Sequence, residues 1–286
     1  MLLIADNTGL IVSRHAGYEH SGSTAAWAYQ YLDLSNAKHI FLLGPSHKRY
    51  LSGCALSTHS HYATPLGHLK LDREVIKELL ATKKFIAWDK ESEGLEHSLE
   101  MHLPYIYKMI SKQFKSDSEH PTLIPILVGG TSAASERFYG QILAPYLAQP
   151  TSVFVVSSDF CHWGLRFEYT TYIPEDDKLT DLEPGQPNPT NPPIFESIAH
   201  LDKLAMDAIE GGKHQDFLDN LRETRNTVCG RHPIGVIMAA LEVLERDGKI
   251  SGQGNGRFKF IQYKRNDDVK DIYGSSVSYA SAVAVL

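Results

Sequence analysis

Three short apolar runs in this chain each lead, within a few residues, into a histidine. The runs and the histidines that follow them are 10–12 with His15, 40–43 with His47, and 153–156 with His162. Continuous apolar runs of this length are typical of strands that are buried on both faces of a sheet. In open α/β sheets ligands bind beyond the carboxyl ends of the strands, so we expect the three imidazoles at one edge.

Imidazole is a common ligand of zinc, copper and iron, so this edge is a candidate metal site. A single histidine after a strand is more often an ordinary surface residue. It is the joint placement of three that favours a metal, and spacing alone leaves the two interpretations about evenly matched.

The rest of the chain alternates between predicted strands and predicted helices. This alternation predicts an α/β layered sandwich with a central mixed β-sheet that is flanked by helices. Pro104 should kink or restart one helix, and Pro145 should interrupt another. The expected strands are 10–13, 39–43, 54–58, 123–128, 153–157, 258–263 and 277–285, and the expected helices are 23–32, 72–81, 97–114, 135–147, 192–209, 214–222 and 233–246.

Composition narrows the class of protein further. The 286 residues carry a net charge of -6 and 42% hydrophobic residues, which fits one globular domain over 1–286 and does not favour nucleic acid as a partner. No apolar run is long enough to predict a membrane span. The odd, sparse cysteines Cys54, Cys161 and Cys229 argue against a disulfide framework. We expect a reducing compartment, the cytoplasm or also the nucleus.

The segment 172–193 departs from the pattern of the rest. It holds six prolines, and five acidic residues lie between Glu175 and Glu183. Such a composition cannot bury much apolar surface, so we expect an exposed, mobile surface insertion. A lid over the site is the alternative.

The densest cluster of reactive side chains follows the third apolar run. Asp159 precedes His162 by three residues, so its carboxylate could orient the imidazole and raise its basicity. His162 would then act as a general acid or base, or as a further ligand. In the alternative interpretation Asp159 caps a turn and His162 packs beside Trp163.

Cys229 lies just before a predicted helix whose first residue should be Pro233. A helix N-terminus and the neighbouring Arg231 favour the thiolate, a soft ligand for copper, zinc or iron. An inert buried cysteine is the alternative, and the residues alone favour it slightly. Arg231 and His232 are candidate pocket residues in the same stretch.

A second histidine-rich stretch runs from Glu96 to His102. Its two histidines, His97 and His102, are five residues apart and do not share a helix face, so it is not the His-Glu-x-x-His zinc signature. His97 and Glu100 do share a face, and we expect this pair to line the pocket.

Six strings in this chain, taken together and in order, resemble the Memo family, which is named for a mediator of ErbB-driven cell motility. They span nearly the whole chain. The strings are HAGY (15–18), GPSH (44–47), EHS with EMHLPY (96–98 and 100–105), VVSSDFCHWG (155–164), CGRHPIG (229–235) and SSVSYA (275–280).

The resemblance implies a fold like that of class III extradiol dioxygenases, in which two histidines and a glutamate hold ferrous iron. In Memo-like proteins a cysteine stands in place of the glutamate. Carried onto this chain, the resemblance implies His15, His47 and Cys229 as metal ligands, with Asp159 and His162 beside the metal. It also implies iron or copper as the metal, with zinc as a further option.

Three functions are open, two of them implied by the resemblance and the third by the chemistry of two histidines and a cysteine around a metal. The first is iron- or copper-dependent redox activity linked to signalling, cell motility or growth. The second is a non-enzymatic adaptor that binds a peptide or phosphopeptide, although phosphate readers usually carry clustered arginines. The third is zinc-dependent hydrolysis, with His162 as the base for a metal-bound water.

The chain departs from the family pattern in two places. Residues 1–13 stand where the family usually has a further segment and a helix before its first strand. Arg14 stands where proline is common, directly before His15. A fixed cation beside a metal ligand is expected to weaken the binding of a metal ion.

Overall fold

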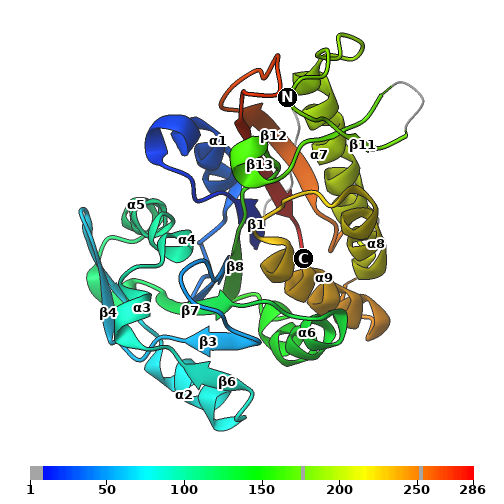
Figure 1. The fold of residues 1–286 in the computed structure, drawn as a ribbon. Coiled ribbons are helices and arrows are strands. Elements are labelled where there is room, and N and C mark those ends of the chain that lie inside the picture. Colours follow the sequence, from blue (N-terminus) through cyan, green and yellow to red (C-terminus); the bar gives the residue numbers. More distant parts are fainter. Residues whose placement is uncertain (1–8, 175–177, 251–253) are drawn as a thin grey trace.

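A mixed β-sheet forms the centre of the molecule in the computed structural model, which describes residues 9–174, 178–250 and 254–286 (Figure 1). The short strand β9 (His162–Trp163) pairs with the start of β13 (Ser276–Ala284). In spatial order the main strands are β12 (Lys259–Arg265), β13 (Ser276–Ala284), β1 (Leu10–Ser13), β8 (Ser152–Ser157), β2 (His39–Pro45), β7 (Thr122–Val128), β3 (Cys54–Leu56) and β6 (Phe85–Ala87).

The four central strands β1, β8, β2 and β7 run parallel. The strands β13 and β3 join this centre antiparallel, so the sheet is mixed, as predicted. Ser13 of β1 lies opposite Ser157 of β8, and Leu43 of β2 lies opposite Val156. The strands that precede the three histidines therefore end almost level, and the loops that follow them meet at one edge.

Helices cover both faces of this sheet, which confirms the predicted layered sandwich. Val12 and its alternate neighbours pack with α2 (Arg73–Ala81), α6 (Ala133–Leu147) and α9 (Arg231–Arg246), whereas Ile11 and its alternates pack with α1 (Tyr18–Tyr31) and α5 (Leu103–Gln113). Burial on both faces explains why the central strands read as continuous apolar runs.

A third cluster of buried residues lies at the β9 end of the molecule. Cys161 and Trp163 pack there against α7 (Ile194–Gly211), which is followed by α8 (His214–Thr224). No helix in the described part of the chain combines the length and the apolar character that a membrane crossing requires.

Several element boundaries differ from the sequence prediction. The expected helix 97–114 is split into α4 (His97–Glu100) and α5. Pro104 lies in the first turn of α5, where a backbone N–H would have no partner within the helix, so its absence costs no hydrogen bond. Pro145 does not interrupt α6, which continues through it to Leu147. Pro233 is not the first residue of α9, which begins two residues earlier at Arg231.

Short exposed elements escaped prediction altogether. The hairpin of β4 (His61–Thr64) and β5 (Gly67–Lys70) is half exposed and mostly polar, so it carries no apolar signal. The short helices α3 (Lys90–Glu93) and η1 (Asp117–Glu119) are likewise too brief to show a helical period.

The expectation for 172–193 needs a correction. Residues 175–177 lie outside the described residues, as do residues 1–8 of the opening segment. β10 (Thr171–Tyr172) pairs with β11 (Thr180–Asp181), and Tyr172 and Ile173 are buried. The segment therefore does bury apolar side chains, although most of its described residues after Ile173 are exposed or half exposed. The single-domain division of the chain stays a prediction.

The contact between α6 and α9 yields a stability prediction. A Cβ at Gly140 would lie 2.8 Å from both the Ala239 Cβ and the Ala240 backbone nitrogen. Both atoms are held in place by the α9 backbone, so they cannot move aside easily. Gly140→Ala should therefore destabilise the fold by about 1–3 kcal/mol through overpacking. The same change at Gly211, where a Cβ meets nothing within 4 Å, should be neutral or stabilising by up to about 1 kcal/mol.

Urea unfolding of both variants would measure these opposite signs. Equal effects of the two alanines would show that the two helices can separate freely at Gly140.

Candidate metal centre

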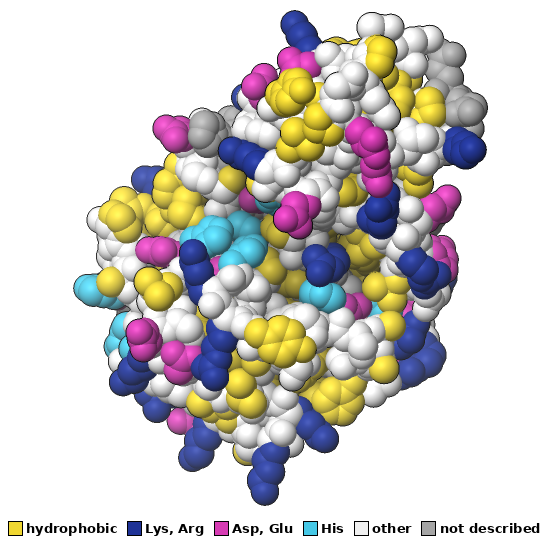
Figure 2. Space-filling model, in the orientation of Figure 1, with side chains coloured by type: hydrophobic (Ala, Val, Ile, Leu, Met, Phe, Trp, Pro, Cys, Tyr) yellow, Lys and Arg dark blue, Asp and Glu magenta, His cyan; other side chains and the backbone are white. Residues whose placement is uncertain are grey.

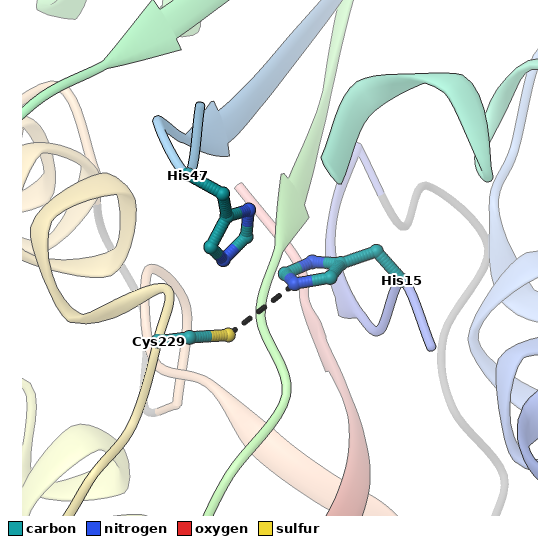
Figure 3. A group of neighbouring side chains, drawn as sticks. All are labelled: His15, His47 and Cys229. Carbon is teal, nitrogen blue, oxygen red and sulfur yellow. Dashed lines mark hydrogen bonds between the residues drawn. The ribbon is translucent and has the colours of Figure 1, made fainter. Parts of the chain in front are cut away.

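Histidine side chains gather near the middle of one face of the molecule (Figure 2). Three potential ligand atoms, one each from His15, His47 and Cys229, lie within 4.8 Å of one another. His15 follows β1, His47 follows β2, and Cys229 precedes α9. All three side chains point toward a common centre (Figure 3). The structure thus brings together the three residues that the resemblance implied as ligands, and metal binding by them stays a prediction.

A close backbone contact sets the position of Cys229. A Cβ at Gly230 would lie 2.4 Å from the Ser157 carbonyl oxygen and 2.3 Å from the Ser158 Cβ. Only glycine lets the start of α9 approach the end of β8 so closely. The backbone N–H of Asp159 then donates to the Cys229 Sγ at 3.2 Å.

A hydrogen-bond relay fixes the protonation of His15. The Ser157 hydroxyl donates to the Ser98 carbonyl oxygen at 2.7 Å, so it must accept from the His15 Nδ1–H, which lies 2.6 Å away. The Nε2 atom is then the unprotonated nitrogen of the neutral ring. It faces the Cys229 Sγ at 3.4 Å (Figure 3). Burial lowers the pKa of His15, and the neighbouring imidazoles lower it further, so the neutral ring is favoured.

A carboxylate fixes His47 in the same way. Glu96 Oε1 accepts from the His47 Nδ1–H at 3.0 Å, and Glu96 Oε2 accepts from the His47 backbone N–H at 2.7 Å. Burial opposes the charge on Glu96, but hydrogen bonds from His47 and Ser98 outweigh it and lower the pKa to about 2. The ionised carboxylate orients the ring and leaves Nε2 to face the site, as in many metal-bound histidines.

The ring of His162 is oriented through its Nδ1–H, but not by Asp159 as predicted. The His162 Nδ1–H donates to the Phe160 carbonyl oxygen at 2.8 Å, and the His162 backbone N–H donates to the Thr227 hydroxyl at 2.7 Å. The carbonyl oxygens of Phe160 and Thr227 therefore take the role that the sequence suggested for the carboxylate.

Asp159 lies against His15 instead. Its Oδ1 accepts from the His15 backbone N–H at 3.1 Å, and its Oδ2 is 3.8 Å from the His15 Nε2. Asp159, His162 and Cys229 form a second group of potential ligand atoms within 4.8 Å. Burial raises the pKa of Asp159, although His162 and Arg14 partly offset that shift.

The expected thiolate at Cys229 is wrong for the chain without a metal. Burial raises the pKa of the Cys229 thiol, and the nearby Asp159 raises it further. The N–H of Gly230 and the charge of Arg231 act in the predicted direction but do not overcome desolvation. A metal ion would therefore have to displace the thiol proton on binding.

The predicted pocket residues separate into two groups. The His97 ring stacks on His47 with centroids 4.7 Å apart and lies 5.5 Å from the His15 ring, so it joins the site. Glu100 is exposed and belongs to no group of potential ligand atoms among the described residues.

The start of α9 turns the other two predicted pocket residues away from the ligands. The His232 Nδ1 instead lies 2.7 Å from the Glu136 Oε1, and Glu136 Oε2 is 2.6 Å from the His214 Nε2. Arg231 is exposed, and its charge lowers the pKa of the Cys229 thiol less than the backbone N–H groups around the sulfur do.

Glu96 and Ser157 were missed by the sequence analysis as supporting residues. Each lies inside one of the strings that resemble the Memo family, and this was the one signal in the sequence that could have identified them. Neither has a spacing that predicts its partner, because Glu96 reaches His47 across 49 residues and Ser157 reaches His15 across 142.

Arg14 is buried beside the site without a hydrogen-bond partner. All three of its guanidinium nitrogens lack one among the described residues. The guanidinium lies 4.9 Å from the centroid of the Tyr279 ring. Burial lowers the pKa of Arg14 to about 10, against the attraction of Asp159. The side chain is therefore still a cation at neutral pH, and its expected effect on metal binding stays a prediction.

The donor set fits a transition metal. Two imidazole nitrogens and one sulfur suit iron, copper or zinc, and the carboxylate of Asp159 lies next to them. The 3.4 Å between His15 Nε2 and Cys229 Sγ matches the roughly 3.5 Å that separates two such ligands on a tetrahedral ion. The residues present therefore fit the metal that the resemblance implied.

Comparison with known proteins agrees with the strings in the sequence. The model of the Memo-like protein family matches residues 5–283. Protein MEMO1 of Homo sapiens is 41% identical over 271 residues, covering 95% of this chain and 83% of the human protein. The memo-1 homolog of Caenorhabditis elegans is 40% identical over 273 residues, covering 96% of this chain and 71% of the worm protein.

A solved structure supports the fold alone. The crystal structure of an uncharacterized protein from Escherichia coli K12 superposes with a TM-score of 0.52 at 14% sequence identity, covering 96% of this chain and 98% of that one.

The contact between Glu96 and His47 yields a prediction about metal affinity. Glu96→Gln removes the charge that orients His47, and loss of such a supporting partner typically lowers metal affinity by about 10–100-fold. The matched control Glu100→Gln changes the net charge equally at an exposed position on α4 and should leave the affinity unchanged. Competition titration with a chelator would measure both. Equal affinity in the two variants would contradict the orienting role of Glu96.

The burial of Arg14 yields a prediction about stability. Arg14→Met replaces an unpaired buried cation with an apolar side chain of similar length, so it should stabilise the fold by about 1–3 kcal/mol. Arg222→Met, at an exposed arginine of α8, should change stability by less than about 0.5 kcal/mol. Urea unfolding would compare them. A loss of stability in Arg14→Met would mean that the ring of Tyr279 and the charge of Asp159 more than compensate the guanidinium.

Proposed function

This chain belongs to the Memo family, and from that premise we propose that it is a metal-dependent redox protein. The ligands are His15, His47 and Cys229, and iron or copper is the metal. The observation that carries the proposal is the convergence of three donors, two of which are imidazoles with Nδ1–H already tied to Ser157 and Glu96.

Iron and copper would supply one-electron chemistry at this site. The sulfur ligand favours them over the magnesium and calcium that prefer oxygen, and it distinguishes the site from a ring-cleaving dioxygenase with a glutamate ligand. A thiolate donates charge differently from a carboxylate and can itself be oxidised, so we do not propose catechol cleavage.

His162 is the proposed group for proton transfer. Its Nδ1–H is held by backbone carbonyl oxygens, so Nε2 can accept and return a proton without a change of ring orientation. A carboxylate oxygen of Asp159 lies within 4.8 Å of a ring nitrogen of His162, where it would stabilise a protonated imidazole.

The phosphopeptide adaptor is less well supported by the arrangement of charges. Phosphate readers use clustered, accessible arginines. Of the two arginines in or beside the ligand strings, Arg14 is buried and only Arg231 is exposed.

Metal analysis of purified variants would test the proposal. The wild-type chain and Cys229→Ala would each be reconstituted separately with iron, copper and zinc. We expect one equivalent of iron or copper in the wild type and at least a tenfold weaker affinity in Cys229→Ala, because one of three ligands is lost. Cys54→Ala, at a buried cysteine of β3, is the control and should retain the metal.

Each other outcome would count against the redox proposal in its own way. Tight binding of zinc alone would favour hydrolysis, and activity that survives without oxygen would support that conclusion. Equal metal content in Cys229→Ala would show that the ligand set is wrong. No metal in any protein would favour the adaptor.

A further inference from the structure

A cavity borders Glu96, the residue that orients His47. Its volume is about 250 Å³, and its lining comes from α3, α4, the start of α5 and the strand β4. Glu96 lines this cavity, but none of the metal ligands His15, His47 and Cys229 does. The cavity is therefore separate from the metal centre, although the two share one supporting residue.

The cavity has apolar walls and a polar mouth. The buried side chains of Trp88, Leu99 and Leu103 form much of the wall. Exposed polar residues at the mouth include Glu100 and Lys90, so the cavity opens to solvent beside charges of both signs.

One wall carries a buried carboxylate whose hydrogen bonding is incomplete. The side chain of Glu93 is only 5% exposed. Its Oε1 accepts from the Tyr62 hydroxyl, but its Oε2 has no hydrogen-bond partner within the described part of the chain. The nearest ring nitrogen, the His59 Nε2, is 3.7 Å away, beyond hydrogen-bond distance. A buried carboxylate oxygen without a donor is costly, so a ligand that supplies one would bind favourably.

We propose that this cavity binds a small alkylammonium group, whose N–H donates to the Glu93 Oε2. The alkyl part lies against Leu99 and Leu103, and the ammonium charge is paired with the carboxylate. The ligand is either a free alkylamine or the side chain of a lysine in a peptide, since both present the same chemistry.

Other ligand classes fit less well. An anion would meet Glu93 and Glu100, and a neutral apolar ligand would leave the Glu93 Oε2 without a donor. A metal ion would need several ligands, and no group of three potential ligand atoms among the described residues includes Glu93.

Binding can be tested on the full-length chain in the presence of a chelator, so that the metal centre plays no part. The probes are n-butylamine and Nα-acetyl-lysine amide, with n-butanol as the neutral analogue of the amine. The readout is the nitrogen–proton NMR signal of the Trp88 indole, which donates to Ser92 at 3.0 Å beside the cavity. Trp88→Phe identifies that signal.

We expect a saturable shift of the Trp88 signal with an amine probe and none with n-butanol. Glu93→Gln keeps an oxygen for Tyr62 but removes the charge, and it should weaken amine binding by about tenfold or more. The matched control Glu91→Gln removes an exposed charge from the same short helix and should leave the affinity unchanged.

A second variant keeps the test independent of any effect of Glu93→Gln on folding. Ala63→Phe fills the cavity from an exposed position on β4 without altering a charge, and it should also abolish binding. Binding of n-butylamine alone would identify free amines as the ligand, and binding of the lysine derivative would identify a peptide. No saturable shift with either amine, or equal affinity in wild type and Glu93→Gln, would overturn the proposal.

Discussion

The Ser157 hydroxyl is the contact on which the arrangement of the site depends. It accepts from His15, which follows β1, and donates to the Ser98 carbonyl oxygen in α4. Because Ser157 is itself the last residue of β8, one side chain ties three separate segments together and sets which nitrogen of His15 is bare. The parallel register that places Ser13 opposite Ser157 makes this contact possible.

Buried charge is the second constraint around the site. Glu96, Asp159 and Arg14 are each less than 5% exposed, yet only Glu96 has enough hydrogen bonds to lower its pKa to about 2. Burial raises the pKa of Asp159 and lowers the pKa of Arg14, so in both residues it favours the neutral form. Such incompletely compensated charge is expensive in a stable core and is typical of functional sites.

Glu96 lies between the candidate metal centre and the cavity lined by Glu93. Its carboxylate is saturated by N–H donors from the His47 loop and from Ser98, so it acts as a fixed support. Glu93, three residues earlier, has the same chemistry but one oxygen without a donor. Two buried glutamates in one short segment thus differ in a single respect, which is whether the fold itself supplies their hydrogen-bond donors.

The sequence by itself determined the sheet, its central strands and the edge where the histidines lie, because continuous apolar runs and the residues after them are local signals. The family strings also identified His15, His47 and Cys229. Only the tertiary structure decided that Glu96 holds His47, that Ser157 holds His15, and that His232 contacts Glu136. These contacts join residues tens to hundreds of positions apart, and desolvation, which raises the pKa of the Cys229 thiol, depends on packing that no local pattern contains.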